Sequence, residues 1–322
     1  MKVFDAHADI LNDVVNKRRL SYDNILENFH MEKLEKGYVF GSIFSIWVEP
    51  EYSNNYRKRT FEILSAAAVE FNNAKNRLQL VTSFKDFIRA ENSNKMAVLL
   101  GLEGMASIDK DIELIYFLYQ YGIRAGSLTW NEENVLATGI NGDPNRGLSP
   151  YGIHAIKIME KLGIILDVSH LNEKSFWDVN NYVNKPFISS HSNVYSLCKH
   201  PRNLKDDQIK AIAAAKGVIG INSWPDFIDE ENPTLDRLLC HIDYIVDLVG
   251  IDYIGLGFDF CDFLENTTID LISKNKKTIP NFSNASQISN LIEELIKRGY
   301  SQNEISKITH KNFMRVFKEI LK

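Results

Sequence analysis

The sequence predicts an α/β protein that folds as a (β/α)8 barrel of the TIM type, with residues 1–322 in a single domain. Three observations lead to this prediction. Eight short apolar or β-branched runs are spaced along the chain, most are followed by a segment with helical spacing, and several end in His, Asp or Glu. Strands that alternate with helices indicate a parallel sheet, and eight repeats favour a closed barrel over an open doubly wound sheet.

The predicted strands lie at 3–9, 38–47, 96–101, 124–129, 163–168, 186–190, 217–222 and 253–257. Helix signals fill several of the gaps between them. Apolar residues recur at nearly 3.6-residue spacing over 56–71. Ser149-Pro150 and Gly163 mark the two ends of 148–162, and Ser301 with Glu304 forms a capping-box pattern. We therefore expect helices over 56–71, 148–162 and 206–215, and a last helical region that opens at Ser301.

Two long connections interrupt the repeat, at 137–147 and 261–283. The first is rich in Gly and Asn, and the second is polar with little periodicity. Loops of this length inside a compact domain tend to be lids or binding loops. We expect both to border the functional site.

The composition argues against several kinds of partner. The 37 Lys and Arg residues are outnumbered by 42 Asp and Glu, so no basic surplus exists to neutralise nucleic acid or an anionic membrane. No signal-peptide pattern follows Met1, and no apolar run approaches the ~18 residues of a membrane span, so we expect a cytoplasmic protein. Cys198, Cys240 and Cys261 are odd in number and widely spaced, which predicts free thiols.

Ligand-type residues recur at the strand ends, where barrel enzymes place their working groups. His7 and Asp9 stand two apart in an extended segment, so they project from one face and could share a zinc ion. One histidine at a strand end is usually only a capped polar residue, but a full set predicts a metal site. By contrast, His30 and His310 lie in polar surroundings and are expected at the surface. The remaining strand ends supply Glu103, His170, His191 and Asp259.

Five short motifs carry a resemblance to a known family. They are Phe-Asp-Ala-His-Ala-Asp at 4–9, Gly-Leu-Glu-Gly at 101–104, Asp-Val-Ser-His at 167–170, Ser-His-Ser at 190–192 and His-Pro-Arg-Asn at 200–203. Together they resemble the signatures of the membrane (renal) dipeptidase family of zinc hydrolases. The similarity runs in order from the first strand to Asp259.

The resemblance implies a (β/α)8 barrel that holds two zinc ions. Carried over motif by motif, His7 and Asp9 would bind one ion, His170 and His191 would bind the other, and Glu103 would bridge them and take part in catalysis. Two metal ions close together can lower the pKa of a shared water towards ~7 and stabilise the oxyanion formed when that water attacks an amide. A dipeptide is the implied substrate.

The resemblance also implies roles around the substrate. Asp259 would pass the proton of the water to the leaving amine, and Arg202 would hold the terminal carboxylate of the substrate in a planar fork. The family usually has Thr-His-Asn after the fourth strand, whereas this chain has Thr129-Trp130-Asn131. We therefore expect Trp130 and Asn131 to contact the substrate, with the carbonyl-polarising role of the missing histidine left open.

Two alternatives stand beside a cytoplasmic zinc dipeptidase. One is a binuclear metal hydrolase of other amides, lactams, lactones or phosphoesters, although such barrels more often open with His-x-His. The other is a metal-binding barrel without turnover. Barrels of this kind often pair through their outer helices, so a homodimer is one option for an oligomeric state that the sequence leaves open.

Overall fold

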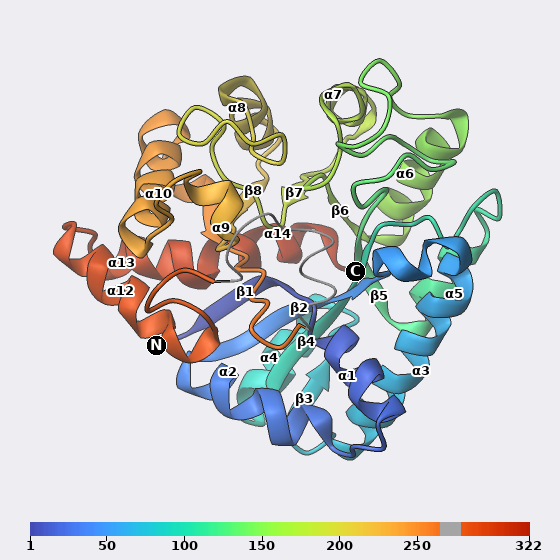
Figure 1. The fold of residues 1–322 in the computed structure, drawn as a ribbon, viewed down its shortest axis with the longest axis horizontal. Helices are drawn as coiled ribbons and strands as arrows, with labels where there is room; N and C mark the ends of the chain where they lie inside the picture. Colours follow the sequence, from blue (N-terminus) through green and yellow to red (C-terminus); the bar gives the residue numbers. More distant parts are fainter. Residues whose placement is uncertain (265–277) are drawn as a thin grey trace.

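Eight parallel strands close into a ring in the computed structural model, which describes residues 1–264 and 278–322 (Figure 1). The strands follow one another around the ring in chain order, and β1 pairs with both β2 and β9. The predicted barrel is therefore confirmed. The ring consists of β1 (Val3–Ala8), β2 (Val39–Trp47), β4 (Met96–Glu103), β5 (Ile123–Ser127), β6 (Ile165–Asp167), β7 (Ile188–Ser189), β8 (Val218–Ile221) and β9 (Ile254–Leu256).

A further short strand, β3 (Leu78–Leu80), was not predicted from the sequence. It pairs with Met96–Val98 at the start of β4. β5 pairs with the same side of β4 later in the strand, from Leu100 to Glu103. The ring itself closes through β2, which pairs with β4 from Gly41 to Trp47. β3 has only three residues and, unlike the similarly short β6, β7 and β9, lies outside the predicted apolar runs.

Helices surround the ring and connect its strands (Figure 1). The predicted caps are confirmed: Ser149 accepts a hydrogen bond from the Gly152 amide, Gly163 ends its helix at φ +79°, and Ser301 and Glu304 form a capping box. The helices are α1 (Ile10–Arg19), α2 (Glu32–Lys36), α3 (Tyr56–Asn73), α4 (Phe84–Asn92), α5 (Leu114–Tyr121), α6 (Pro150–Leu162), α7 (Glu173–Tyr182), α8 (Asp206–Ala214), α9 (Pro225–Ile228), α10 (Leu235–Val249), α12 (Ile288–Lys297), α13 (Gln302–Ser306) and α14 (Asn312–Ile320).

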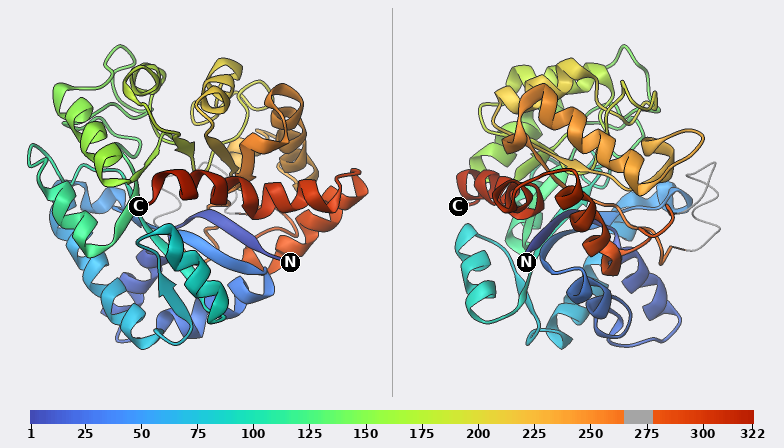
Figure 2. Two further views of the ribbon diagram at one scale, coloured as in Figure 1. Left: turned by 180° about the vertical axis from the view of Figure 1, so that it is seen from behind. Right: turned by 90° about the vertical axis from the view of Figure 1, so that its left-hand side faces the viewer.

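The core has two main parts. The larger part fills the space between the strands and the surrounding helices. The other joins the inner side chains of the strands to α14, which crosses the barrel at the end seen from behind in Figure 2. Phe4 of β1 packs there against Phe313 and Phe317 of α14, with ring centroids 5.9 and 5.0 Å apart. We call this cluster of Phe4, Phe313 and Phe317 the aromatic plug. It occupies one end of the barrel, and the pocket described below lies at the other end.

Several expectations about loops and surface residues are corrected or limited. The segment 137–147 contains no helix or strand, as predicted, but most of the predicted loop 261–283 lies outside the described residues. His30 is buried and bonds Asp13 at 2.8 Å, and His310 is half-buried, so the prediction of surface histidines is wrong for His30. Among the described residues, no helix combines the length and apolarity that crossing a membrane requires.

Candidate metal centre

The ligand-type residues predicted from the sequence come together at the open end of the barrel. The parallel strands all point their carboxyl ends there, so residues at or just after each strand end become neighbours. The six converging residues are His7 in β1, Asp9 after it, Glu103 at the end of β4, His170 after β6, His191 after β7 and Asp259 after β9.

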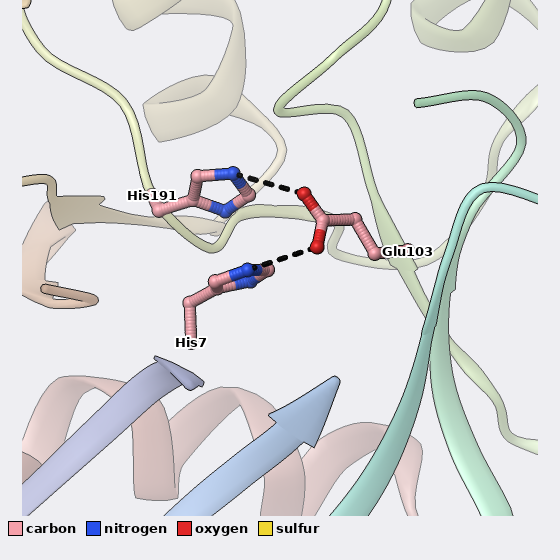
Figure 3. Close-up of side chains that lie close together, drawn as sticks. All are labelled: His7, Glu103 and His191. Carbon is pink, nitrogen blue, oxygen red and sulfur yellow. Dashed lines mark ion pairs between the residues drawn. The ribbon is translucent and has the colours of Figure 1, made fainter. Parts of the chain in front are cut away.

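One group of ligand atoms lies around His7. Its Nε2 is 3.1 Å from Oε2 of Glu103 and 3.5 Å from Oδ1 of Asp9. All three side chains are buried, yet none of these three atoms makes a hydrogen bond with any residue that the structure describes. Figure 3 shows His7 and His191 facing the two oxygens of the same carboxylate. Buried polar atoms are costly to leave unsatisfied, so this group fits a bound cation.

A second group lies around the other oxygen of Glu103. Its Oε1 is 2.7 Å from Nε2 of His170 and 3.7 Å from Nε2 of His191, and these two nitrogens are 2.9 Å apart. Glu103 therefore touches both groups of ligand atoms. The residue after it, Gly104, has φ +88°, and a Cβ there would lie 2.8 Å from the Trp130 amide nitrogen, so only glycine fits this turn.

Neighbouring side chains select the tautomers of the second pair. Nδ1 of His170 lies 2.8 Å from the Asn131 amide oxygen, an acceptor, so this nitrogen carries the proton. Nδ1 of His191 lies 2.7 Å from the Ser190 hydroxyl. With both protons on Nδ1, each Nε2 turns a lone pair towards Glu103. Two lone pairs and a carboxylate oxygen in mutual contact fit a divalent cation of the zinc type.

Burial and charge shape the ionisation of the centre. Burial raises the pKa of Glu103 to about 8. Burial also disfavours a charge on His7, but the adjacent carboxylates outweigh it and raise its pKa well above the usual value. The pKa values of His170 and His191 are lowered well below the usual value by burial and by the positive charge of Arg202. The two histidines of the second pair are thus neutral, as metal ligands must be.

Asp259 borders the first group of ligand atoms. One of its oxygens lies within 4.8 Å of ligand atoms of His7 and Asp9, and its Oδ2 accepts a hydrogen bond from Asn222 at 3.2 Å. Burial raises the pKa of Asp259 to about 6. Its backbone adopts φ +57°, which is uncommon for a residue other than glycine and is often found at functional sites. A carboxyl group in this position can exchange a proton near neutral pH.

Arg202 is buried beside the second group, although its charge has no carboxylate in hydrogen-bond contact within the described ranges. It is 3% exposed, and its Nη2 lies 3.2 Å from Nε2 of His170 and 3.5 Å from the His191 carbonyl. Its Nε and Nη1 make no hydrogen bond to any described residue. Burial lowers its pKa to about 10, so it stays charged at neutral pH. A buried cation with free N–H groups can bind a carboxylate through two parallel bonds.

A pocket opens over these residues, and its walls are largely aromatic. The predicted residues Trp130 and Asn131 both line it, although Asn131 also supports His170, a role that the sequence did not predict. Trp130 packs against Trp47 with ring centroids 5.5 Å apart. Sequence reasoning missed several wall residues because single residues of these types carry no pattern that ties them to a site. These are Trp47, Trp224, Phe227, Cys261 and Leu264.

The chain is similar to several known proteins. The pattern of the family described as membrane dipeptidase, peptidase family M19, matches residues 1–322. An uncharacterized protein of the pqqA 5′ region of Klebsiella pneumoniae is 32% identical over 76% of this chain and 89% of its own length. An uncharacterized dipeptidase of Schizosaccharomyces pombe is 29% identical over 99% of this chain and 80% of its own length.

A solved structure shows the same fold. A metallopeptidase from Rhodobacter sphaeroides, bound to a phosphinate mimic of the dipeptide L-Ala-D-Ala, superposes with a TM-score of 0.88 at 20% identity over 99% of both chains. The family match spans the whole length of the sequence given, and the structural match spans nearly all of it. The chain therefore belongs to the membrane dipeptidase family, peptidase family M19, whose members are hydrolases of peptide bonds.

Proposed function

We propose that this protein is a zinc-dependent dipeptidase with two metal ions in the centre. His7 and Asp9 would hold one Zn²⁺, His170 and His191 would hold the other, and Glu103 would be a ligand of both. The observation that carries the proposal is that Nε2 of His7, Oδ1 of Asp9 and Oε2 of Glu103 are buried together without a hydrogen bond to any described residue. The other oxygen of Glu103 lies 2.7 Å from Nε2 of His170. Imidazole and carboxylate donors of this kind suit zinc.

The residues of the chain divide the chemistry between them. Two bound Zn²⁺ ions would lower the pKa of a shared water and polarise the carbonyl group that the water attacks. Asp259 faces the same space with a carboxyl group that exchanges protons near neutral pH, so it accepts the proton from the water and gives it to the leaving amine. Asn222 donates to Oδ2 of Asp259 at 3.2 Å, whereas Oδ1 accepts a longer hydrogen bond from the Cys261 thiol at 3.8 Å, so we assign the transfer to Oδ1.

Arg202 accounts for the choice of short peptides. Its two unpartnered N–H groups lie beside the second pair of histidines, where they bind the terminal carboxylate of the substrate. Because the clamp is buried and fixed, it sets the distance from the C-terminus of the peptide to the bond that is cleaved. A longer peptide would have to place its chain where Arg202 lies.

The aromatic walls define the kind of dipeptide that fits. Trp47, Trp130, Trp224 and Phe227 present flat apolar faces to the pocket, which favours substrates with apolar side chains. The metallopeptidase from Rhodobacter sphaeroides binds a mimic of L-Ala-D-Ala. A test of this chain should therefore include both L,L and L,D dipeptides.

The deciding experiment is a zinc titration of chelator-stripped protein with bound metal counted and a panel of L,L and L,D dipeptides as substrates. We expect cleavage to rise as the second equivalent binds. His191→Ala should lose metal and activity, whereas His154→Ala, at an exposed histidine of α6, is the matched control. Two tightly bound zinc ions with no cleavage of any dipeptide would overturn the dipeptidase assignment, and a panel of lactams, lactones and phosphoesters would then identify another hydrolase.

A further inference from the structure

A buried carboxylate behind the metal centre organises the loops that carry the second histidine pair. Asp167, the last residue of β6, accepts hydrogen bonds at Oδ1 from the Ser169 amide at 3.0 Å, the Ser169 hydroxyl at 2.6 Å and the Ser190 amide at 3.0 Å. Its Oδ2 accepts the hydroxyl proton of Ser190. Ser169 and Ser190 immediately precede His170 and His191, so one carboxylate ties both ligand-bearing loops together.

Ser190 stands between Asp167 and a metal ligand, and its hydrogen bonds have a fixed direction. A hydroxyl group has one proton to donate, and Ser190 gives it to the carboxylate, which can only accept. The contact of 2.7 Å between Ser190 Oγ and Nδ1 of His191 must then be donated by the histidine. The proton of His191 is thereby held on Nδ1, and its Nε2 is left with a lone pair towards Glu103.

The serine that precedes Ser190 provides an internal comparison. Ser189 is equally buried, but its hydroxyl bonds Ser192 at 2.6 Å and Ser169 at 3.2 Å, both of them serines and neither a proposed metal ligand. The ring of His170, in contrast, is held by the neutral amide of Asn131. Only His191 of this pair is backed by a carboxylate through an intervening hydroxyl.

We propose that Asp167 and Ser190 are positioning residues that fix the tautomer and orientation of His191 for metal binding. The proposal rests on the metal centre of the proposed function and adds a supporting relay to it. A carboxylate behind a ligating histidine raises the basicity of the ligand and locks its ring, and removing such a partner typically costs about 10–100-fold in metal affinity. Metal bound by the His170 and His191 pair should weaken by this factor in Ser190→Ala, while metal bound by His7 and Asp9 should not.

Asp167→Asn offers a second variant of nearly unchanged shape. An amide nitrogen in the place of Oδ2 would donate to Ser190, which could then give its own proton to Nδ1 of His191. That reversal would move the histidine proton to Nε2, where it blocks the metal. We therefore expect Asp167→Asn to weaken the second metal site at least as much as Ser190→Ala.

The test uses the full chain and Zn²⁺ as the probe. Metal-free wild type, Ser190→Ala, Asp167→Asn and the control Ser189→Ala are titrated with Zn²⁺ against a competing chelator. Nitrogen-15 correlation spectra of the metal-free proteins identify the tautomer of His191, a readout that a purely structural loss would not move. The expected result is an Nδ1–H tautomer and two tight sites in wild type and Ser189→Ala, with an altered tautomer and one weakened site in the other two variants.

Two results would count against the proposal, and they differ from a failure of the metal centre. If Ser190→Ala keeps the wild-type tautomer and both zinc affinities, the relay is refuted while the two-metal site stands. If wild type itself binds fewer than two zinc ions, the proposed metal centre fails first. Equal weakening in Ser189→Ala and Ser190→Ala would also refute the relay, because it would point to general packing.

Discussion

The proposed Arg202 clamp makes a quantitative prediction, because it would pair one side chain with one end of the substrate. Replacing the buried guanidinium in Arg202→Met leaves the terminal carboxylate of a dipeptide without a partner in the pocket. Removing one member of a buried, hydrogen-bonded charge pair costs about 2–5 kcal/mol. Because two N–H groups of Arg202 are free for the substrate, we expect about 3 kcal/mol, which corresponds to a loss of about 150-fold in kcat/KM.

The assay is a cycle of two enzymes and two substrates. Wild type and Arg202→Met are each measured with a dipeptide and with its C-terminal amide, which has the same shape but no charge. Amidation should cost wild type about 2–3 kcal/mol but cost Arg202→Met little, since the interaction that amidation removes is already absent. Arg89→Met, at an exposed arginine of α4, controls for nonspecific effects of the substitution.

One outcome would refute this reasoning directly. The test is whether the free-energy losses in kcat/KM caused by amidation and by Arg202→Met add up when both changes are made. If they add, the two changes act independently, and Arg202 does not bind the carboxylate. Its buried charge would then serve the histidine pair alone, through Nη2 and the Nε2 of His170.

Three further predictions concern metal, backbone and pH. A chelator should lower the Tm, measured by calorimetry, by about 10 °C. The reason is that free Zn²⁺ at about 100 times the Kd of a site adds about 2.7 kcal/mol per site to the free energy of unfolding. An unchanged Tm would contradict tight metal binding. Gly104→Ala, forced to φ +88° against the Trp130 amide, should cost about 1–3 kcal/mol of stability in urea unfolding, with a larger relative loss of activity. Burial alone would raise the pKa of Asp13, but the hydrogen bonds from His30 and Lys17 outweigh it and hold this pKa below 3.8. Asp13→Asn should therefore lower the unfolding free energy by about 1–3 kcal/mol at pH 7, and the difference from wild type should shrink as the pH falls below about 4. A difference that does not change with pH would contradict this reasoning.

The sequence was informative about the ring and its caps because those features are local. Each strand of the ring coincides with a predicted apolar run, and Ser149, Gly163 and Ser301 end or begin helices as their local chemistry dictates. The three-residue strand β3 was missed because its pairing with β4 depends on a neighbour in space. His30 was misplaced for a similar reason, since its partner Asp13 comes from α1 and shields it from solvent.

The candidate site divides in the same way. The ligand-type residues were found because they follow strand ends, and the barrel brings all strand ends to one mouth; their individual roles remain predictions. The contacts that support them were not predictable. Asp167 reaches Ser190 across two loops, and Asn131, expected beside the substrate, lines the pocket and also bonds His170. Such pairings depend on side-chain packing between elements that are distant in the sequence.

The aromatic plug at the closed end of the barrel has a consequence for the order in which the molecule folds. Phe4 and Phe317, whose rings lie 5.0 Å apart, come from opposite ends of the sequence. A contact between residues so far apart in the sequence requires a long loop to close, and the entropy lost in that step is offset only afterwards by the burial of apolar surface. We therefore expect slow folding, with this end of the barrel open to solvent until α14 packs against it. The proposed metal ligands, spread from His7 to His191, lie on or next to strands that come together as the ring forms. We therefore expect Zn²⁺ to bind after the barrel has closed and to leave the rate of folding nearly unchanged.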